Sequence, residues 1–496
     1  MIEHATEITY RGELKSCNYN CSYCPFSKRK YSIKEIERDK DKWCNFLNKI
    51  SNINFKENVS VLIAPYGEAL IHNYYVKGIA KLCRMKKIRK IGCQTNLSLN
   101  VQSFIHELEK ENVNLDKITL WCTYHPEMTT VDEFVEKIKY LRKKINLSVG
   151  VVGNPKDIEI IKKLRKSLPV EVYLWINSMD GLNRKYTEEE ISIFNDIDPM
   201  FDLEVKNYLN KRKCIGGKEH FFIDFKGDIY PCNKVRKTLG NLYSNDTIKK
   251  ETSCLKGRCD CYLSYSHLKG LKKLDFFNKD ELVRVPKRLD IKAIFLDVDG
   301  TLVSKDGKIK NEDILALEYL SKIALIYLNT ELPYEKAMKK CKKIKRLLSG
   351  GSFANGAHIV EKTNNYEVYN YLLKTPNLCN EYKIYSYKDR PYKILIRGKI
   401  DSEIIKDMNN SGYYNIIHNH GRLSIVNSGV NKLSGLSVIC KKLKLDKEKV
   451  MVIGNSNNDL SMIKGIYHSV AETGASKELI EEARYRLKVA QLPYII

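Results

Sequence analysis

Short apolar, β-rich runs alternate with amphipathic helical runs along most of this chain, and that alternation limits its possible folds more than any other feature. Between Glu7 and about Pro199, the runs that are typical of strands are 60–64, 90–94, 117–121, 148–152 and 170–175. Helices are expected between them, for example at 131–144 and 156–167. Because parallel strands need long crossover connections, this order predicts an α/β fold in which helices cover a parallel sheet.

The alternation is interrupted and then starts again in the second half of the chain. Residues 210–262 contain short strands, glycine turns and five cysteines, and the charged segment 271–290 has no clear period. We expect that charged segment to be a linker. A new apolar strand at 291–296 opens a second parallel sheet. An insertion that begins with Ser349–Phe353 is expected to interrupt this second sheet, and the strand at 449–453 returns to it.

The composition excludes some classes of protein. With 496 residues, of which 43% are hydrophobic and 29% charged, the chain has room for two to four soluble domains at roughly 100–200 residues each. No apolar run approaches the roughly 20 residues of a membrane-spanning helix, and the first ten residues lack the regions of a signal peptide. We therefore expect a cytoplasmic protein without membrane contact. The net charge of +25 is spread over both halves, so nucleic acid is not expected as a substrate.

Twelve of the fifteen cysteines precede residue 262, and three of them lie on one short loop after the first strand. Cys17, Cys21 and Cys24 have a spacing that can ligate three irons of a [4Fe–4S] cluster and leave the fourth iron open. A fully ligated electron-transfer cluster or a structural zinc would need a fourth ligand nearby. The next cysteine, Cys44, falls in a predicted helix. The loop therefore favours an open iron-sulfur site, with zinc as the alternative.

This loop resembles the cysteine motif of radical S-adenosylmethionine (SAM) enzymes. Segment 65–70 resembles the family's Gly-Gly-Glu-Pro motif, whose backbone binds the SAM amino group, although Tyr66 and Ala69 depart from it. The end of the third strand and segment 149–154 also resemble the family. The resemblance implies a partial (β/α)6 barrel and these cofactor-binding residues: Tyr23, Gly67, Glu68, Thr95 and Asn96.

The resemblance also implies a reaction. Reductive cleavage of SAM gives methionine and a 5′-deoxyadenosyl radical, which removes a hydrogen atom from an unactivated carbon, and the cofactor carries this chemistry. A reduced flavodoxin or ferredoxin is the implied electron donor, and a small molecule is the expected substrate.

A second group of cysteines surrounds a predicted hairpin at 221–231. Cys214 and Cys232 flank it, and a hairpin brings its two ends together. The segment resembles the auxiliary-cluster extension of radical SAM enzymes called SPASM, or its shorter form, twitch. It has fewer cysteines than a full SPASM domain, which implies one auxiliary [4Fe–4S] cluster held by Cys214, Cys232 and two or three of Cys254, Cys259 and Cys261. A structural zinc knuckle is the alternative.

Two carboxylates, Asp297 and Asp299, follow the strand that opens the second sheet. Period-two alternation points both into the crevice where parallel sheets bind ligands. One carboxylate of such a pair can attack phosphorus while the other protonates the leaving oxygen. A calcium-like turn or an acidic hairpin is the alternative.

Segment 295–302 resembles motif one of the haloacid dehalogenase (HAD) phosphatases, and 454–462 resembles their last motif, with Asn455 where an Asp is usual. The resemblance implies a Rossmann-like core in which Asp297 is the nucleophile and Asp299 the acid/base. Thr330 would bind the phosphate and Lys432 would balance its charge. The implied magnesium ligands are Asp297, Asp299 and Asp459. We expect the loss of one carboxylate at Asn455 to weaken Mg²⁺ binding.

The insertion contains Ala354-Asn-Gly-Ala357, which resembles the α/β cap of the Cof-type HAD subfamily. That subfamily acts mostly on sugar phosphates and other small phosphoesters. The domain boundaries that we expect are therefore 1–205 for a radical SAM core, 206–270 for the auxiliary-cluster extension, 271–290 for the linker, 291–348 with 429–496 for the HAD core, and 349–428 for its cap.

These motifs together predict a bifunctional enzyme. Its radical SAM half would oxidise or rearrange a small metabolite, phosphorylated or not, and its HAD half would be a magnesium-dependent phosphatase. The alternative is a peptide- or RNA-modifying radical SAM enzyme whose HAD half only binds. His125 is a further candidate for contact with SAM or substrate, and the scattered cysteines, among them Cys44, are expected to be buried thiols.

Overall fold

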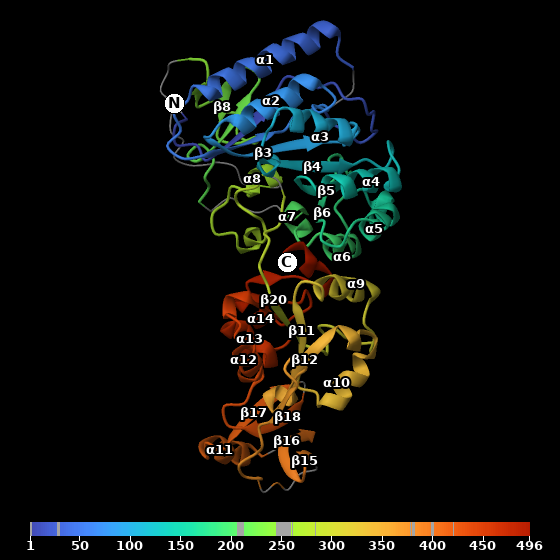
Figure 1. Ribbon diagram of the computed structural model, residues 1–496, viewed down its shortest axis with the longest axis vertical. Coiled ribbons are helices and arrows are strands. Elements are labelled where there is room, and N and C mark those ends of the chain that lie inside the picture. The colour runs from blue at the N-terminus through green and yellow to red at the C-terminus, as the bar shows by residue number, and fades with distance from the viewer. Residues whose placement is uncertain are drawn as a thin grey trace. The chain divides into compact units, whose positions relative to one another are not determined.

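The computed structural model describes residues 2–26, 30–205, 213–244, 259, 261–282, 284–376, 378, 382–397, 401–419 and 421–496. The chain divides into two compact units, Met1–Lys287 and Arg288–Ile496. Figure 1 shows the helices and strands of both units. Within the described ranges, no helix combines the length and the apolar character needed to cross a membrane.

The N-terminal unit is built on a nine-stranded sheet with the order β6-β5-β4-β3-β2-β1-β7-β8-β9. Its strands are β1 (Glu7–Arg11), β2 (Val59–Ile63), β3 (Ile88–Thr95), β4 (Ile118–Tyr124), β5 (Asn146–Val152), β6 (Leu174–Asn177), β7 (His220–Asp224), β8 (Asp228–Tyr230) and β9 (Gly240–Asn241). Strands β1 to β6 are parallel and follow one another in chain order. The predicted α/β class with a parallel sheet is confirmed.

Helices connect these strands and cover one side of the sheet (Figure 1). They are α1 (Ile33–Ser51), α2 (Asn73–Arg84), α3 (Val101–Lys110), α4 (Val131–Leu141), α5 (Ile158–Ser167), α6 (Glu188–Ile197) and α7 (Phe201–Val205). The short helix α8 (Tyr262–Tyr265) follows β9 and lies on the other face of the sheet, where Tyr262 contacts the ring of Trp121. Local sequence fixes their starts: Ser32 and Glu35 form a reciprocal capping box at α1, and Thr130 and Glu133 form another at α4.

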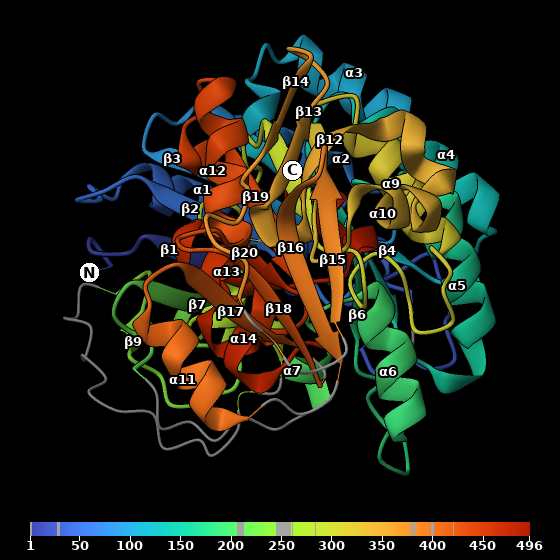
Figure 2. The same ribbon diagram turned by 90° about the horizontal axis from the view of Figure 1, so that it is seen from below.

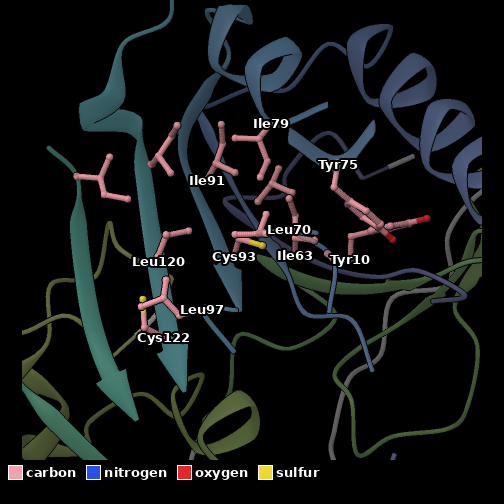
Figure 3. Packing of buried hydrophobic residues seen from close by; sticks show 14 of the residues in the cluster. Tyr10, Ile63, Leu70, Tyr75, Ile79, Ile91, Cys93, Leu97, Leu120 and Cys122 are labelled. Carbon is pink, nitrogen blue, oxygen red and sulfur yellow. The ribbon is translucent and has the colours of Figure 1, made fainter. Parts of the chain in front are cut away.

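The core of this unit lies between the sheet and the helices. Alternate residues of each strand point toward the helices, such as Ile91 and Cys93 of β3 and Leu120 and Cys122 of β4 (Figure 3). Tyr75 and Ile79 of α2 pack against them, and Tyr10 of β1 stacks on Phe46 of α1 with ring centroids 4.1 Å apart. The residues that intervene on each strand face the other side of the sheet. Cys44 is exposed on α1, so the prediction of a buried thiol there is wrong.

The segment expected as a linker, 271–290, instead packs into the N-terminal unit as far as Lys287. Phe276 and Phe277 are buried, and both contact the ring of Tyr173, Phe276 edge-on and Phe277 at a tilt. Arg284 is completely buried, pairs with Glu204 and lies over the ring of Trp175. The charged residues of this segment predicted that it would be exposed to solvent. Arg284, however, forms its ion pair with Glu204 in the interior of the unit.

The C-terminal unit contains an eight-stranded sheet with the order β14-β13-β12-β11-β10-β19-β20-β21. Its strands are β10 (Ala293–Leu296), β11 (Leu325–Asn329), β12 (Leu348–Phe353), β13 (His358–Glu361), β14 (Tyr366–Tyr369), β19 (Val450–Gly454), β20 (His468–Ala471) and β21 (Tyr485–Arg486). The helices around it are α9 (Asn311–Leu320), α10 (Tyr334–Lys340), α12 (Lys432–Lys442), α13 (Leu460–Gly465) and α14 (Lys477–Glu482). Strand β10 is parallel to β11 and to β19. The order reverses at β10, as in Rossmann-like sheets, so the carboxyl end of β10 opens into the crevice where such sheets bind ligands.

A four-stranded antiparallel sheet forms the cap, in the order β15-β16-β18-β17. It consists of β15 (Tyr382–Tyr387), β16 (Arg390–Arg397), β17 (Tyr414–Asn419) and β18 (Arg422–Asn427), with α11 (Ser402–Asn410) beside β17 (Figure 2). The expected start of the cap at 349 is corrected by the structure, because β12, β13 and β14 belong to the core sheet. Gly351, in the segment expected to open the insertion, lies in β12, where its close neighbours leave no room for a Cβ.

Candidate functional site

The cysteine loop of the N-terminal unit lies at the carboxyl ends of the parallel strands. The side-chain amide of Asn96, just after β3, donates from Nδ2 to Cys17 Sγ at 3.5 Å. Nδ1 of His125, just after β4, lies 3.4 Å from Cys21 Sγ. The same His125 nitrogen is 2.9 Å from the hydroxyl of Tyr23. Cys24 is half-buried, and its amide donates to the carbonyl of Cys21. Two neighbouring strand ends thus touch the loop.

The thiols of this loop act on one another electrostatically. Burial, together with the nearby Cys24 and Cys17 sulfurs, raises the pKa of Cys21 to about 11, although a hydrogen bond with Tyr23 lowers it. Burial also raises the pKa of Cys17. The negative charge of one thiolate disfavours ionisation of the next, so a cation or metal centre would favour the ionised form of all three. Cysteine thiolates are the usual ligands of iron-sulfur clusters, so the kind of donor on this loop is compatible with one.

The segment after β2 holds the cysteine loop in place. The amide of Gly67 donates to Leu14 O and the amide of Glu68 to Ser16 O, both at 3.0 Å. A Cβ on Gly67 would lie 2.0 Å from Ser16 O, so the close approach requires glycine. The Glu68 carboxylate accepts from Thr95 Oγ1 at 2.8 Å.

The Glu68 carboxylate also accepts from the backbone amide of Asn96 at 2.6 Å. Burial raises the pKa of Glu68 to about 7. The structure thus brings Gly67, Glu68, Thr95 and Asn96 together beside Cys17, whereas Tyr23 lies with His125 on the other side of the loop. This arrangement does not test whether Gly67, Glu68, Thr95, Asn96 or Tyr23 contacts a cofactor, so their role in cofactor binding stays a prediction.

The second group of cysteines surrounds the hairpin of β7 and β8. Cys214 Sγ accepts from the amide of Gly216 at 3.3 Å, and a Cβ on Gly216 would lie 3.0 Å from the carbonyl of Pro231, next to Cys232. Asn233 Nδ2 lies 3.9 Å from the sulfur of Cys261.

Cys259 is buried, and Cys254 lies outside the described residues. Over the described ranges, no three His, Cys, Asp or Glu side chains are grouped as a preformed metal site. The metal-binding roles predicted for the two cysteine groups and for the aspartates stay predictions.

In the C-terminal unit, Asp297 directly follows β10 and lies deep in the crevice. The ammonium of Lys432, at the start of α12, contacts Asp297 Oδ1 at 2.6 Å and Asp459 Oδ1 at 2.5 Å. The exposed fractions of these side chains are 1% for Lys432, 5% for Asp297 and 0% for Asp459. A single cation therefore joins two buried carboxylates from distant parts of the chain.

Asp299 has a different environment from Asp297. Its side chain is 42% exposed, and it accepts from Lys340 of α10 at 2.5 Å. Strand β10 ends at Leu296, and a tight turn follows in which the Gly300 amide donates to Val303 O. Period-two alternation therefore does not extend to Asp299. Within the described residues its carboxylate pairs with Lys340, whereas Lys432 pairs with Asp297 and Asp459.

Thr330 directly follows β11, the neighbour of β10, and is buried. Its amide donates to Ser352 O at 2.9 Å, and its hydroxyl accepts from the Leu332 amide at 3.2 Å. Asn355 lies beside it, with its amide donating to Thr330 O at 3.0 Å. Ala354 and Asn355 both have positive φ angles, of 52° and 61°, in a tight turn behind the threonine.

Comparison with known proteins bears on this unit. The profile of the haloacid dehalogenase-like hydrolase family matches residues 294–378 and 373–491. The C-terminal unit carries a haloacid dehalogenase-like hydrolase domain. The phosphoglycolate phosphatase of Methanothermobacter thermautotrophicus is 24% identical over 203 residues, or 39% of this chain and 91% of that protein.

Two further relatives of the haloacid dehalogenase-like domain can be named. The 5-amino-6-(5-phospho-D-ribitylamino)uracil phosphatase YcsE of Bacillus subtilis is 28% identical over 229 residues, or 40% of this chain and 90% of that protein. A crystal structure of a haloacid dehalogenase-like hydrolase from Bacteroides thetaiotaomicron has 20% identity and a TM-score of 0.35, covering 41% of this chain and 98% of that one.

Electrostatics within the haloacid dehalogenase-like domain depend on the buried pair. Burial and the nearby Asp459 carboxylate raise the pKa of Asp297 well above its usual value, although Lys432 lowers it. Burial alone would lower the pKa of Lys432, but the two carboxylates raise it above its usual value. The ammonium therefore stays charged and holds negative charge on its partners.

The last motif of the domain positions Asp459 through the backbone. Asp459 Oδ2 accepts from the amides of Asn455 and Ser456 at 3.0 and 3.1 Å. The amide group of Asn455 packs against Gly300, and its Oδ1 is buried without a hydrogen-bond partner among the described residues. An amide oxygen and carboxylates are suitable ligands for Mg²⁺, so this donor set fits the ion.

Several residues of the haloacid dehalogenase-like domain escaped sequence reasoning. Lys340, the partner of Asp299, lies in a lysine-rich helix that shows no motif. Glu331 and Lys393 are 62 residues apart in the sequence, yet the Lys393 ammonium donates to the Glu331 carbonyl where the cap contacts the core. Glu331 could have been suspected because it directly follows Thr330, but no local signal marks Lys393. His418 of β17 is exposed, and His420 lies outside the described residues.

Proposed function

We propose that the haloacid dehalogenase-like domain is a magnesium-dependent phosphomonoesterase. The observation that carries this proposal is the buried Asp297 carboxylate at the centre of the sheet, held by Lys432 beside Asp459. A carboxylate fixed at the carboxyl end of the central strand can reach a phosphorus atom bound in the crevice. Two relatives whose names are phosphatases, one of them for phosphoglycolate, support the same reaction.

The proposed reaction has two steps. An oxygen of Asp297 attacks the phosphorus of the ester, the bond between phosphorus and the alcohol oxygen breaks, and Asp299 gives its proton to that oxygen. Water then attacks the phosphorus on Asp297 while Asp299 takes up a proton, and inorganic phosphate leaves. Thr330 and Lys432 hold the phosphate oxygens and balance their charge.

Asp297, Asp459 and the amide oxygen of Asn455 are the residues that would hold Mg²⁺. The bound ion would supply positive charge to the phosphate oxygens. Asp299 was also predicted as a ligand, but in this structure its carboxylate pairs with Lys340. We therefore assign Asp299 to proton transfer.

The test is hydrolysis of p-nitrophenyl phosphate with and without Mg²⁺. We expect the wild type to be active and Asp297→Asn to lose activity by at least about 1,000-fold, since it removes the nucleophile. Asp299→Asn should slow the reaction by about 100-fold or more. Asp306→Asn is the matched control, because Asp306 lies in a nearby exposed turn and hydrogen-bonds Ser304. An Asp297→Asn variant as active as the wild type would refute the proposal.

We further propose that the N-terminal unit binds a [4Fe–4S] cluster and SAM. What supports this is the meeting of the cysteine loop with the ends of β3 and β4 and with the segment around Gly67. Cys17, Cys21 and Cys24 would hold the cluster. When bound, the cluster and SAM would supply a 5′-deoxyadenosyl radical that removes a hydrogen atom from the substrate.

An auxiliary [4Fe–4S] cluster is part of the same proposal. Cys214, Cys232 and Cys261 are the described cysteines that lie around the β7–β8 hairpin, with Cys259 next to Cys261 in sequence and Cys254 outside the described residues. A reduced flavodoxin or ferredoxin would supply the electron, and a small molecule would be the substrate.

Anaerobic reconstitution followed by iron and sulfide analysis tests both clusters. We expect about eight irons per chain, and 5′-deoxyadenosine after addition of dithionite and SAM. Cys21→Ala should lower the iron content by about four and abolish SAM cleavage. Cys83→Ala is the matched control, because Cys83 is a buried thiol on α2. Zinc in place of iron, without SAM cleavage, would overturn this part of the proposal.

The two activities make the chain bifunctional in the proposal, with a small metabolite as substrate. A second candidate is a peptide- or RNA-modifying radical SAM enzyme with a non-catalytic haloacid dehalogenase-like domain. Asn455 favours that candidate, because it removes one carboxylate from the proposed metal site. An iron-loaded protein that cleaves SAM but hydrolyses no phosphate ester would support it.

A further inference from the structure

The cap sheet has one face toward α11 and one face toward the core of the haloacid dehalogenase-like domain. Ile394 and Ile396 of β16 and Ile425 of β18 pack with Met408 of α11 in the hydrophobic centre of the cap. Successive residues of a strand point to opposite sides, so the residues between these, such as Lys393, face the other way. Contacts with Glu331 show that this other face meets the core.

Two cap residues contact Glu331, which directly follows Thr330. Lys393 Nζ donates to Glu331 O at 2.6 Å, and Asn419 Nδ2 donates to Glu331 Oε2 at 2.9 Å. A third contact is weaker, since Lys336 Nζ of α10 lies 3.4 Å from the hydroxyl of Tyr385 on β15. The core-facing side of the cap thus closes over the loop that carries the proposed phosphate-binding hydroxyl.

Lys393 is the unusual residue on this face, because its side chain is almost completely buried without an ion pair. It is 2% exposed, and in the described part of the chain its one hydrogen bond is to the Glu331 carbonyl. An ammonium has three N–H donors, so two remain without an acceptor. A buried charge with unused donors is unfavourable unless an anionic partner arrives.

The charges around Lys393 also favour an incoming anion. The cations Lys432, Lys336 and Arg422 act on the Lys393 ammonium, and the Glu331 carboxylate opposes them. Burial and these cations lower the pKa of Lys393 to about 8, so it is mostly protonated at neutral pH. Lys393 donates to the carbonyl of Glu331, which directly follows Thr330, so it lies near the proposed phosphate-binding hydroxyl, on the side of the cap.

We propose that Lys393 binds a second anionic group on the alcohol part of the substrate, so that the preferred substrates are phosphate esters that also carry a carboxylate or another phosphate. This inference rests on the proposed phosphatase function and specifies its substrate class. The phosphate to be cleaved lies at Asp297 and Thr330, and the second anion lies under the cap at the Lys393 ammonium.

Matched substrate pairs test this assignment. One pair is 3-phosphoglycerate and glycerol 3-phosphate, which differ by a carboxylate, and the other is fructose 1,6-bisphosphate and fructose 6-phosphate, which differ by a phosphate. We expect kcat/KM of the wild type to favour the anionic member of at least one pair by about 10-fold or more. Lys393→Met should reduce that ratio by roughly 10- to 100-fold, mainly through KM, as expected for loss of a charged hydrogen bond. The pair that responds shows which anion is bound.

Two more variants separate charge recognition from cap closure. Asn419→Ala removes the other cap contact to Glu331 without changing charge, and should lower kcat/KM equally for both members of a pair. Lys393→Arg keeps the charge and should retain most of the preference, which also controls for misfolding.

The inference is overturned if Lys393→Met leaves the ratio unchanged, or lowers both members equally as a cap latch would. It is also overturned if the wild type shows no preference while it hydrolyses p-nitrophenyl phosphate. Inactivity of the wild type toward p-nitrophenyl phosphate and all four esters would instead refute the phosphatase proposal, and this inference with it.

Discussion

Replacing Lys432 by methionine is expected to destabilise the C-terminal unit strongly when Mg²⁺ is absent. The ammonium is 1% exposed and lies within 2.6 Å of carboxylates on Asp297 and Asp459, which are 5% and 0% exposed. Methionine fills a similar volume but leaves two buried carboxylates close together without a cation. Removing one partner of a buried ion pair destabilises a protein by about 3–5 kcal/mol.

The expected change in melting temperature follows from the size of the unit. For a unit of about 200 residues, 1 kcal/mol shifts Tm by roughly 2–4 °C, so Lys432→Met should lower it by about 6–20 °C. The assay is scanning calorimetry of the full chain in EDTA. Lys464→Met is the matched control, because Lys464 is 51% exposed and its contact with Glu482 is 3.5 Å long. We expect that exposed pair to contribute less than about 1 kcal/mol.

A double variant tests the electrostatic reason for the effect. Lys432→Met with Asp459→Asn removes one of the two uncompensated carboxylates, so it should recover part of the stability that Lys432→Met loses. The reasoning is refuted if Lys432→Met melts within about 2 °C of the wild type. A double variant that is less stable than the single variant would also contradict it.

Three further changes have defined outcomes. Arg284→Met should destabilise the N-terminal unit by about 3–5 kcal/mol in calorimetry, because it leaves the Glu204 carboxylate buried and unpaired. Gly67→Ala should lower the iron content after reconstitution, because its Cβ would lie 2.0 Å from Ser16 O and displace the cysteine loop. Burial raises the pKa of Asp313 from 3.8 to about 6. Below about pH 4 this carboxyl is protonated in both the folded and the unfolded chain and costs no stability, but as pH rises through 6 the folded protein must bury its charged form and loses stability. Asp313→Asn should therefore increase the free energy of unfolding at pH 8 by up to about 3 kcal/mol, with a higher Tm, and should have no such effect at pH 4.

Each of these three has an outcome that would contradict it. Adding Glu204→Gln to Arg284→Met should recover stability, and a further loss would argue against an unpaired charge. Full iron loading of Gly67→Ala would show that the cysteine loop tolerates the displacement. An equal Tm difference for Asp313→Asn at both pH values would exclude titration of this carboxyl as the cause.

Much of the fold could be predicted because its signals are local. The β-rich runs at 60–64 and 117–121 correspond to β2 and β4, and the apolar strand before Asp297 corresponds to β10. The capping boxes fix helix starts in the same way. The predicted cap boundary at 349 failed because strand β12 contains two glycines, which are unfavourable in strands unless tertiary contacts require them.

The parts that could not be predicted depend on contacts between distant residues. Arg284 looked like one charge in a solvated linker, and its burial depends on Glu204 and the ring of Trp175. The strand ends that carry Thr330 and Asp297 are recognisable by their sequence motifs. Lys393 is not recognisable in that way, because it becomes a neighbour of Glu331 only when the cap folds onto the core.

The central claim is that Asp297 is the nucleophile of a phosphatase, and direct detection of the phosphorylated enzyme tests it most closely. The full-length protein with Mg²⁺ and a ³²P-labelled phosphate ester would be quenched in acid within milliseconds, digested and mapped by mass spectrometry. The account predicts label on the peptide that carries Asp297, stable in acid, released by neutral hydroxylamine and absent in Asp297→Asn. Release of phosphate without any label on that peptide, or label on a different residue, would contradict it.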